Sequence, residues 1–347
     1  MRRALELALL GRGQVSPNPL VGCVIVHKDR ATGVERIIGE GWHQRYGEAH
    51  AERNAITSVR AEDRHLLPDS TAYVTLEPCS HYGKQPPCAD LLIENRVGHV
   101  ICCNDDPNPL VGGAGFQKLR GAGISLETGL LNNEGRVLNA RFFTFMENHR
   151  PYIILKWAQT ADGFVAGQEG RPVQISGPLS QRLVHRWRAE EDAIMVGTNT
   201  ARTDNPRLNV RFPPGSSPTP NKPIRIVIDK QLQLARNLNL FDGAQPTLCY
   251  NFIKTETHGQ IAYVKLGSDE PLLPQLLADL YERRIQSVLV EGGTTLLNSF
   301  MDANLWDEMR VFSSPVMLHT GIKAPVVRGE LIDRERVGDD ELSTYRP

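Results

Sequence analysis

The segment EPCSHYGKQPPC (77–88) places two cysteines, Cys79 and Cys88, on either side of a glycine, a lysine and two prolines. Taken alone, the pair is compatible with a disulfide, with a metal site or with coincidence. A histidine, His50, stands upstream in the segment HAE (50–52). One histidine and two cysteines supply three ligands for a tetrahedral zinc ion whose fourth position stays open for water, as catalytic zinc sites require. The conjunction therefore predicts a catalytic zinc site.

Glu52 is the candidate base that such a zinc site would need for catalysis. Two thiolates neutralise the double charge of zinc, so the ion lowers the pKa of its water less than in an all-imidazole site, and a nearby base should help to form hydroxide. Glu52 lies two residues beyond His50, close enough to share that water without being a ligand. A carboxylate can take the proton and pass it to a ring nitrogen or to departing ammonia. The pattern H-x-E, followed by P-C and a further cysteine, is that of zinc nucleobase deaminases.

The spacing of the two cysteines narrows the choice among the families of zinc nucleobase deaminases. Zinc nucleobase deaminases usually carry P-C-x-x-C, whereas Cys79 and Cys88 are farther apart. The segment PCSHYGKQPPC (78–88) resembles the deaminase half of the bifunctional riboflavin-biosynthesis deaminase/reductase family, the RibD type, which has the longer spacing. Other segments that match this family are SPNPLVGCVIV (16–26), GEGWHQRYGEAHAE (39–52), VTLEPCSHYGKQPPC (74–88) and DPNPLVGGAG (106–115).

This resemblance implies a cytidine-deaminase-like α/β/α domain that acts on a diaminopyrimidinone ribosyl phosphate. It makes Lys84 and Asn108 candidates for binding the substrate, together with Asn18, His81 and Asp106. A lysine is a sufficient point charge for a phosphate, although this lysine could instead be a solvated loop charge and the DPNP motif only a turn. The remaining cysteines lack matching partners and are expected to be small buried side chains: Cys23, Cys102, Cys103 and Cys249.

The second half carries a different signal in SVLVEGGTTLLNSF (287–300), an apolar strand followed by two glycines and a helix. Bare backbone amides at a helix N-terminus suit a pyrophosphate, but many strand–GG–helix turns bind nothing. Several further segments resemble the reductase half of the same family, whose fold is like that of dihydrofolate reductase: PYIILKWAQTADG (151–163), HRWRAEEDAIMVGTNTARTDNPRLNVR (185–211), PIRIVID (223–229) and VEGGTTL (290–296).

The second resemblance implies NADPH as the cofactor and two sets of binding residues. NADPH is expected at Ala158, Thr200, Asp204 and the turn of Gly293, Thr294, Thr295, Leu296, Leu297, Asn298 and Ser299. The substrate is expected at Arg188, Leu208, Arg211 and Glu291. Two arginines suit a phosphorylated sugar, because guanidinium binds phosphate in a bidentate fork. Lys156 and Asp162 are candidate proton or orientation groups.

The chain departs from the family at three positions. In RPVQISG (171–177), Pro172 and Gln174 stand where the family has a serine and a tryptophan. Pro172 lacks the hydroxyl group that would contact the substrate, and Gln174 lacks the aromatic ring that would contact the cofactor. Lys230 stands where a serine is expected beside the cofactor, and a cation there suits a 2′-phosphate.

The elements that must position these residues follow an α/β rhythm. In the first part, the patterns predict strands at 21–26, 36–42, 71–76, 99–103 and 124–127 and helices at 49–59 and 89–95. An amphipathic first helix is expected to bury a face formed by Ala4, Leu5, Ala8 and Leu9. The rhythm restarts near NHRP (148–151), so we expect a zinc-dependent deaminase domain over 1–148 and an NADPH-dependent reductase domain over 149–347.

The second part is expected to be another α/β domain. Its strands are predicted at 152–158, 192–197, 223–229, 247–250, 262–266, 287–293 and 308–315. One helix should begin at Pro178 with Ser176 as its cap, and others should cover 271–283 and follow Gly293. The segment RFPPGSSPTPNKP (211–223) reads as a surface loop.

The net charge and the composition of the chain indicate which partners and which compartment to expect. The formal net charge is −1, whereas proteins that bind nucleic-acid phosphates usually carry a basic excess. Apolar stretches stay below the roughly 20 residues that span a bilayer, and six cysteines in 347 residues are few. We therefore expect a cytoplasmic homo-oligomer that acts on a small molecule and binds neither nucleic acid nor membrane.

Two other functions compete with this interpretation. One is an RNA-acting zinc nucleobase deaminase with an appended reductase-like module, which a basic surface groove would favour. The other is a non-catalytic zinc-binding scaffold, which a fourth protein ligand on the metal would favour.

Overall fold

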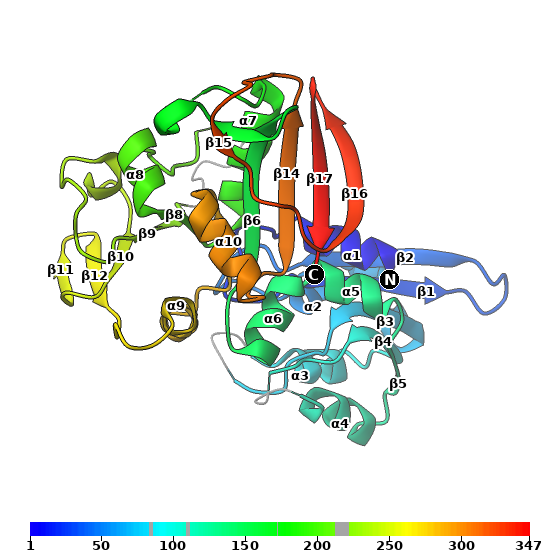
Figure 1. Ribbon diagram of the computed structural model, residues 1–347. Coiled ribbons are helices and arrows are strands. Elements are labelled where there is room, and N and C mark those ends of the chain that lie inside the picture. The colour runs from blue at the N-terminus through cyan, green and yellow to red at the C-terminus, as the bar shows by residue number, and fades with distance from the viewer. Residues whose placement is uncertain (83–85, 109–111, 172, 212–221) are drawn as a thin grey trace. The chain divides into compact units, whose positions relative to one another are not determined.

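The computed structural model describes residues 1–82, 86–108, 112–171, 173–211 and 222–347. The chain divides into two units, Met1–His149 and Arg150–Pro347, each of which has its own large sheet (Figure 1).

The first unit is built on a five-stranded sheet with the strand order β2-β1-β3-β4-β5. Its strands are β1 (Gly22–Lys28), β2 (Glu35–Trp42), β3 (Ser70–Leu76), β4 (His99–Asn104) and β5 (Ser125–Thr128). β1 pairs antiparallel with β2 and β3, whereas β3 pairs with β4, and β4 with β5, in parallel. The helices are α1 (Arg2–Leu9), α2 (Ala51–Ser58), α3 (Cys88–Glu94), α4 (Ala114–Gly121), α5 (Asn132–Leu138), α6 (Ala140–Asn148) and the 3-10 helix η1 (Ala61–Asp69).

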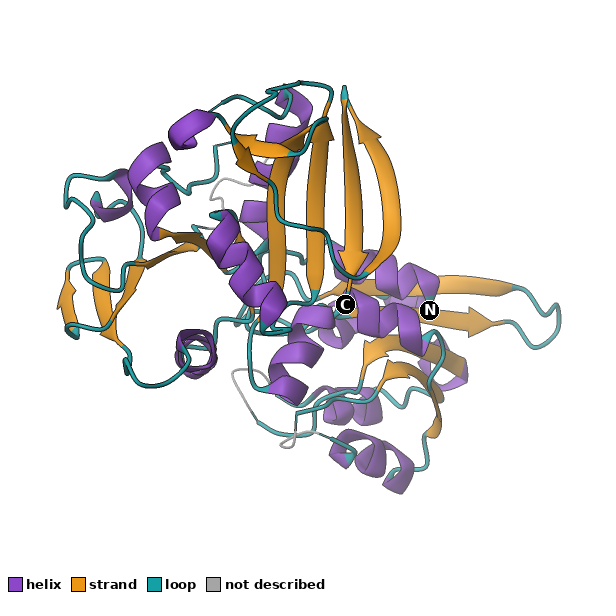
Figure 2. Cartoon of the chain, in the orientation of Figure 1, coloured by secondary structure: helices purple, strands orange, loops and turns teal. Residues whose placement is uncertain are grey.

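Alternation along β1 explains why helices cover both faces of this sheet. Ile25 belongs to a buried cluster with side chains of α2, α3 and α4, whereas its neighbour Val24 packs on the other face against Leu7 of α1. α6 places Phe142 in a further buried cluster with Leu76, the last residue of β3. Successive side chains of a strand point to opposite faces, so the result is the predicted α/β/α arrangement (Figure 2).

The predicted buried face of the first helix is partly wrong. α1 buries Ala4, Leu7 and Ala8, whereas Leu9 is 44% exposed. The buried residues follow the i, i+3, i+4 spacing of one helical face. The sheet therefore selects a face rotated toward Leu7, which the sequence pattern alone did not distinguish.

The second unit contains a ten-stranded sheet in the order β11-β12-β10-β9-β8-β13-β6-β14-β17-β16 and the two-stranded sheet β15-β7. The strands are β6 (Tyr152–Thr160), β7 (Phe164–Ala166), β8 (Ala193–Gly197), β9 (Ile224–Ile228), β10 (Thr247–Asn251), β11 (Glu256–His258), β12 (Ile261–Lys265), β13 (Ser287–Val290), β14 (Glu308–Ser314), β15 (Ile322–Lys323), β16 (Glu330–Val337) and β17 (Asp340–Arg346). The helices are α7 (Pro178–Glu190), α8 (Thr198–Asp204), α9 (Leu272–Glu282), α10 (Thr294–Asp302) and the 3-10 helices η2 (Gln168–Gly170) and η3 (Asn239–Phe241).

The middle of the large sheet is parallel and its ends are antiparallel. The parallel run extends from β12 to β14, and β11, β17 and β16 add antiparallel strands at the edges. Leu155 of β6 packs in the cluster that α9 and α10 cover, whereas Val227 of β9 packs on a second cluster with Leu208 and Leu240. Within the described residues, no helix combines the length and apolarity needed to cross a membrane.

The start of α7 is fixed by a residue far away in the sequence. α7 begins at Pro178 as predicted, but Gly177 occupies the N-cap position, so the prediction of Ser176 as the cap is wrong. Asp340 Oδ2 accepts hydrogen bonds from the Gly177 amide at 2.7 Å and from the Ser180 hydroxyl at 2.6 Å. A carboxylate at a helix N-terminus satisfies free amides and interacts favourably with the helix dipole.

Replacing Asp340 by alanine should lower the free energy of unfolding of the second unit by about 1–2 kcal/mol, the usual effect of losing a helix cap. Urea titration followed by tryptophan fluorescence measures this, because three of the four tryptophans, Trp157, Trp187 and Trp306, lie in the second unit. The exposed neighbour Asp339, changed to alanine, provides the matched control. Equal midpoints for the two variants would mean that Asp340 does not stabilise α7.

Candidate functional site

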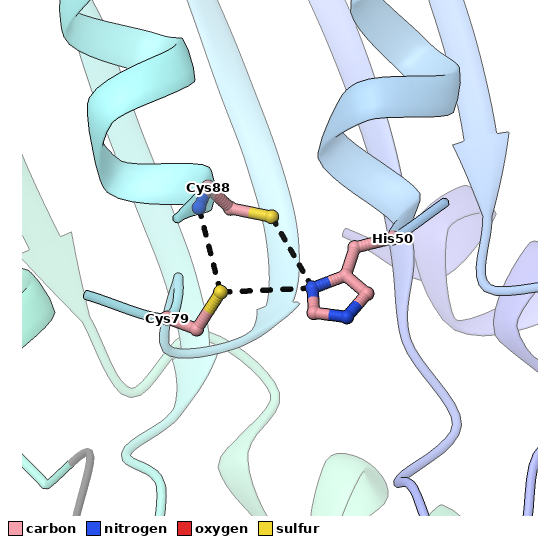
Figure 3. Close-up of side chains that lie close together, drawn as sticks. All are labelled: His50, Cys79 and Cys88. Atoms are coloured by element: carbon pink, nitrogen blue, oxygen red, sulfur yellow. Dashed lines mark hydrogen bonds between the residues drawn. The ribbon is translucent and has the colours of Figure 1, made fainter. Parts of the chain in front are cut away.

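Three side chains from separate segments of the first unit converge on one point (Figure 3). His50 is the N-cap residue of α2, Cys88 is the first residue of α3, and Cys79 lies in the loop that follows β3. His50 Nδ1 lies 3.6 Å from Cys79 Sγ and 3.4 Å from Cys88 Sγ. All ligand atoms of the group lie within 4.8 Å of one another.

These distances fit a zinc ion. Zinc–sulfur bonds of about 2.3 Å and zinc–nitrogen bonds of about 2.0 Å place tetrahedral ligands about 3.5 Å apart. Within the described ranges, no fourth histidine, cysteine or carboxylate joins the group. A three-ligand set leaves a position for water, which is the arrangement of catalytic rather than structural zinc.

The two thiols influence each other's ionisation. Hydrogen bonds from the Cys88 thiol and from His50 lower the pKa of Cys79, and the Cys88 backbone amide, 3.4 Å from the Cys79 sulfur, adds to this effect. The Cys79 thiolate and burial together raise the pKa of Cys88. The two shifts run in opposite directions, so one sulfur ionises more readily than the other, and a dication is what would allow both sulfurs to ionise.

Glu52 lies in the first turn of α2 and is only 3% exposed. Burial, helped by the nearby Cys79 thiolate, raises the pKa of Glu52 to about 7. The side chain of Glu52 also forms a hydrogen bond with Cys88. A buried carboxyl group beside the ligands that can hold or release a proton near neutral pH is suited to acid–base work.

His43 and Asn18 form a polar pair at this site. His43 Nδ1 is 3.1 Å from the carbonyl oxygen of Ala49, which can only accept, so Nδ1 carries the hydrogen and Nε2 accepts from Asn18 Nδ2 at 3.1 Å. Burial lowers the pKa of His43, which keeps the ring neutral. The ring of His43 meets that of His50 edge-on at 5.3 Å. Sequence reasoning had named Asn18 but not His43, whose partners are not adjacent in the chain.

Of the other predicted substrate residues of this half, Asp106 and Asn108 lie in the described part of the chain, whereas Lys84 does not. Asp106 Oδ1 accepts the backbone amide of Asn108 at 2.8 Å, and burial raises the pKa of Asp106 to about 6. The negative charge of Cys79 also acts on Asp106, so this loop lies near the metal ligands. Lys84 lies outside the described residues, as does Pro172 of the second unit.

A cavity of about 810 Å³ opens in the second unit. It lies where β6, β8, β9 and β13 end, which is the usual binding edge of a parallel sheet. Predicted cofactor and substrate residues that line it are Ala158, Thr200, Asp204, Glu291, Gly293, Thr294, Thr295, Leu296, Leu297 and Ser299. Lys156, Gln174 and Lys230 line it as well. Predicted residues that do not line it are Arg188, Leu208, Arg211 and Asn298.

The two glycines before α10 are required by local geometry. Gly292 and Gly293 have φ values of 149° and 82°, which side chains rarely adopt. A Cβ atom on Gly293 would also lie 3.3 Å from the hydroxyl of Thr200. The turn therefore brings the start of α10 and Thr200 together at the wall of the cavity.

A buried ionic cluster lies beside this cavity. Arg188 holds both oxygens of Glu291, with its Nε 2.5 Å and a terminal nitrogen 2.7 Å away, and its other terminal nitrogen donates to the carbonyl of Asn209 at 3.1 Å. Burial alone would raise the pKa of Glu291, but Arg188 and Lys156 lower it to about 2. Burial lowers the pKa of Lys156 in turn. Glu291 thus remains ionised, with Lys156 facing the cavity.

Two further predicted groups have definite partners. Arg211 donates its Nε–H to His185 Nε2 at 3.1 Å. Asp162 accepts the hydroxyl of Thr160 at 2.6 Å and the amide of His319 at 2.6 Å. Asp162 does not line the cavity, so its carboxylate organises a turn rather than the reaction site.

Comparison with known proteins bears on both units. The model of the cytidine and deoxycytidylate deaminase zinc-binding region matches residues 1–104, and that of the RibD C-terminal domain matches residues 151–345. Riboflavin biosynthesis protein RibD from Bacillus amyloliquefaciens is 37% identical over 95% of this chain and 87% of its own length. The Escherichia coli K12 protein of that name is also 37% identical, over 92% and 87%. The chain belongs to the RibD family.

Solved structures agree with this assignment. Acinetobacter baumannii RibD superposes with a TM-score of 0.88 at 32% identity, covering 100% of this chain and 97% of that one. The diaminohydroxyphosphoribosylaminopyrimidine deaminase/5-amino-6-(5-phosphoribosylamino)uracil reductase from Thermotoga maritima has a TM-score of 0.87 at 33% identity, with the same coverage.

This RibD chain is therefore a bifunctional deaminase/reductase of riboflavin biosynthesis, with a cytidine-deaminase-like first half and a dihydrofolate-reductase-like second half. Zinc and a nicotinamide cofactor are the groups that such halves use. The residues present fit both, because three ligand atoms converge in one half and a glycine turn borders a large cavity in the other. The interpretation as a non-catalytic zinc-binding scaffold is thus wrong.

Replacing Cys88 by serine should remove bound zinc, because a neutral hydroxyl is a poor ligand beside one remaining thiolate. Metal analysis after desalting should give far less than one zinc per chain, while oxidation of the nicotinamide cofactor by the other half persists. Cys102, which is also fully buried in the first unit but lies outside the ligand group, provides the control when changed to serine. Stoichiometric zinc in the Cys88 variant would remove Cys88 from the ligand set.

Proposed function

We propose that the two halves of this chain carry out consecutive steps on one intermediate. Residues 1–148 hydrolytically deaminate 2,5-diamino-6-ribosylamino-4(3H)-pyrimidinone 5′-phosphate. Residues 149–347 then reduce the ribosyl group with NADPH, which gives 5-amino-6-ribitylamino-uracil 5′-phosphate. The observation that carries this proposal is the convergence of His50, Cys79 and Cys88 beside the buried Glu52. The two activities in the name of the Thermotoga maritima relative support it.

In the deaminase half, His50, Cys79 and Cys88 would hold zinc, which supplies a polarised water when bound. Glu52 takes a proton from that water and delivers it to the ring nitrogen next to the reacting carbon. A C–O bond forms at this carbon, and the C–N bond to the exocyclic amine breaks. Glu52 then takes the second proton from the hydroxyl group now on this carbon and passes it to the amine, which leaves as ammonia, so the carboxylate ends as it began.

Binding of the substrate is assigned to polar groups around the ligands. Neutral His43 fixes the amide of Asn18, so Asn18 can present its oxygen to a pyrimidine donor. The loop of Asp106 and Asn108 lies near Cys79 and supplies further polar groups. Lys84, in the segment between the two cysteines, is proposed as the cation for the phosphate.

In the reductase half, the cavity wall from Gly293 to Ser299 is proposed to hold the cofactor phosphates, with Ala158, Thr200 and Asp204 around the remainder. NADPH supplies a hydride when bound. The sugar must open at its C1′–O bond before C1′ accepts this hydride, and the ring oxygen then needs a proton. Lys156 lines the cavity beside ionised Glu291 and is the cation that can supply it.

The preference for NADPH is assigned to Lys230. This lysine lines the cavity, and among the described residues no carboxylate forms an ion pair with it. Its ammonium lies 5.9 Å from the centre of the Phe252 ring. An unpaired cation at the cavity wall suits the 2′-phosphate that distinguishes NADPH from NADH.

We further infer a homo-oligomeric enzyme of the cytoplasm with a small-molecule substrate and no nucleic-acid partner. All six cysteines lie in the described residues and none forms a disulfide, which suits a reducing compartment. Leu331 and Ile332, two apolar residues of the otherwise mostly charged edge strand β16, are 43% and 44% exposed, and an unpaired strand edge can pair with another copy. The net charge of −1 does not favour phosphate backbones.

Replacing Glu52 by glutamine tests the deaminase assignment directly. Zinc should stay bound, but ammonia release from the diaminopyrimidine substrate should fall by about 10²-fold or more, because the proton carrier is lost. NADPH consumption should also stop with this substrate yet continue with the deaminated intermediate. Undiminished ammonia release in the variant would refute the role of Glu52, and a wild-type enzyme that releases no ammonia would refute the proposed substrate.

Replacing Lys230 by serine should raise KM for NADPH about tenfold, the equivalent of ~1.4 kcal/mol, while KM for NADH changes little. Steady-state oxidation of each cofactor with the deaminated intermediate measures both constants. Lys265, an exposed lysine of β12 that does not line the cavity, gives the control variant Lys265→Ser. A parallel rise of both constants would mean that Lys230 does not read the 2′-phosphate.

A further inference from the structure

Glu77 is a buried carboxylate that the reaction scheme does not use. It lies between the end of β3 and the metal-ligand residue Cys79, and it is 4% exposed. Its Oε2 accepts backbone amides from Asp106 at 3.4 Å and Gly113 at 3.0 Å, and its Oε1 accepts those of Gly115 at 3.0 Å and Phe116 at 3.3 Å. Four amide donors converge on one side chain.

The four donors come from two parts of the polypeptide. The amide of Asp106 belongs to the loop after β4, whereas Gly113, Gly115 and Phe116 form the N-cap and first turn of α4. The first amides of a helix have no partner within the helix. Glu77 therefore caps α4 and, through the same carboxylate, holds the loop that carries Asp106 and Asn108.

Backbone contacts make this connection tight. The amide of Glu77 donates to the carbonyl of Asn104 at 3.0 Å. A Cβ atom on Gly115 would lie 2.0 Å from the carbonyl oxygen of Pro78 and 3.1 Å from Glu77 Oε1. The start of α4 is thus packed directly on the backbone next to Cys79, with no room for a side chain at Gly115.

We infer that Glu77 is a positioning residue of the deaminase, because it fixes the Asp106–Asn108 loop relative to the metal ligand Cys79. This inference rests on the proposed function in that the loop binds the pyrimidine substrate. Glu77 lies outside the ligand group, so its loss should disturb substrate binding before it disturbs the metal.

A carboxylate is the side chain this position needs. Glutamine has the same shape, but its NH₂ group donates and cannot accept, so two of the four amides would face another donor. Aspartate keeps both acceptors but is one methylene shorter. Glu77→Gln therefore tests the need for two hydrogen-bond acceptors, and Glu77→Asp tests the need for the length of the side chain.

The test compares Glu77→Gln, Glu77→Asp and the control Glu94→Gln, which alters an exposed glutamate of α3. Ammonia release gives KM and kcat, metal analysis gives zinc content, and NADPH oxidation with the deaminated intermediate reports whether the reductase half is folded. We expect KM of Glu77→Gln to rise about tenfold or more with zinc retained, because buried amides are left unpaired. KM of Glu77→Asp should rise less, and Glu94→Gln should match the wild type.

Hydrogen exchange supplies a readout that does not depend on activity. The amides of Gly113, Gly115 and Phe116 should exchange faster in both Glu77 variants than in the wild type. If Glu77→Gln does not fold, Glu77→Asp alone decides by its KM and exchange rates. Wild-type KM with wild-type exchange, or loss of zinc at unchanged KM, would overturn the inference. Failure of the wild type to deaminate the substrate would instead refute the proposed function, while exchange at these amides still tests the anchor.

Discussion

The approach of two thiols and one imidazole to within bonding range of a single cation is the constraint that organises the deaminase half. His50 Nδ1 lies 3.4 Å from Cys88 Sγ and 3.6 Å from Cys79 Sγ, and two thiolates this close repel each other unless a dication lies between them. The helices α2 and α3 each begin at one of these ligands. Since both helices also form the core on the same face of the sheet, packing holds the ligands in place.

The reductase half also brings charged side chains together in its interior, but protein groups rather than a metal ion balance these charges. Glu291, Arg188 and Lys156 are buried together, and a buried charge is tolerated only when it is paired and hydrogen-bonded. Arg188 gives both sides of its guanidinium to Glu291, which leaves Lys156 as the cation that faces the cavity. The ion pair between Arg188 and Glu291 therefore leaves Lys156 to contact a ligand in the cavity, while Arg188 holds Glu291 in place.

Prediction from the sequence succeeded where signals were local and failed where partners were distant. The convergence of His50, Cys79 and Cys88 could be predicted because cysteine and histidine are rare in such spacing, and most strands were found because they are apolar runs. The strand β16 was missed because five of its eight residues are charged and seven are exposed, so it has no apolar alternation. Ser176 was chosen as a cap although the cap comes from Asp340, and Glu77 was missed because its partners are backbone amides. Such pairings have no sequence pattern, since either partner alone is unremarkable.

The predicted pair of arginines shows how the structure refines a prediction of residue type. Arg188 was expected at a phosphate, yet Glu291 and the Asn209 carbonyl occupy its nitrogens. Arg211 is held through Nε by His185, whose pKa burial lowers to about 4, so this ring stays neutral and does not compete for an anion. A guanidinium held through Nε keeps its terminal nitrogens for a bidentate contact. Of the two arginines, Arg188 therefore supports Glu291, whereas Arg211, which does not line the cavity, stays a predicted phosphate ligand.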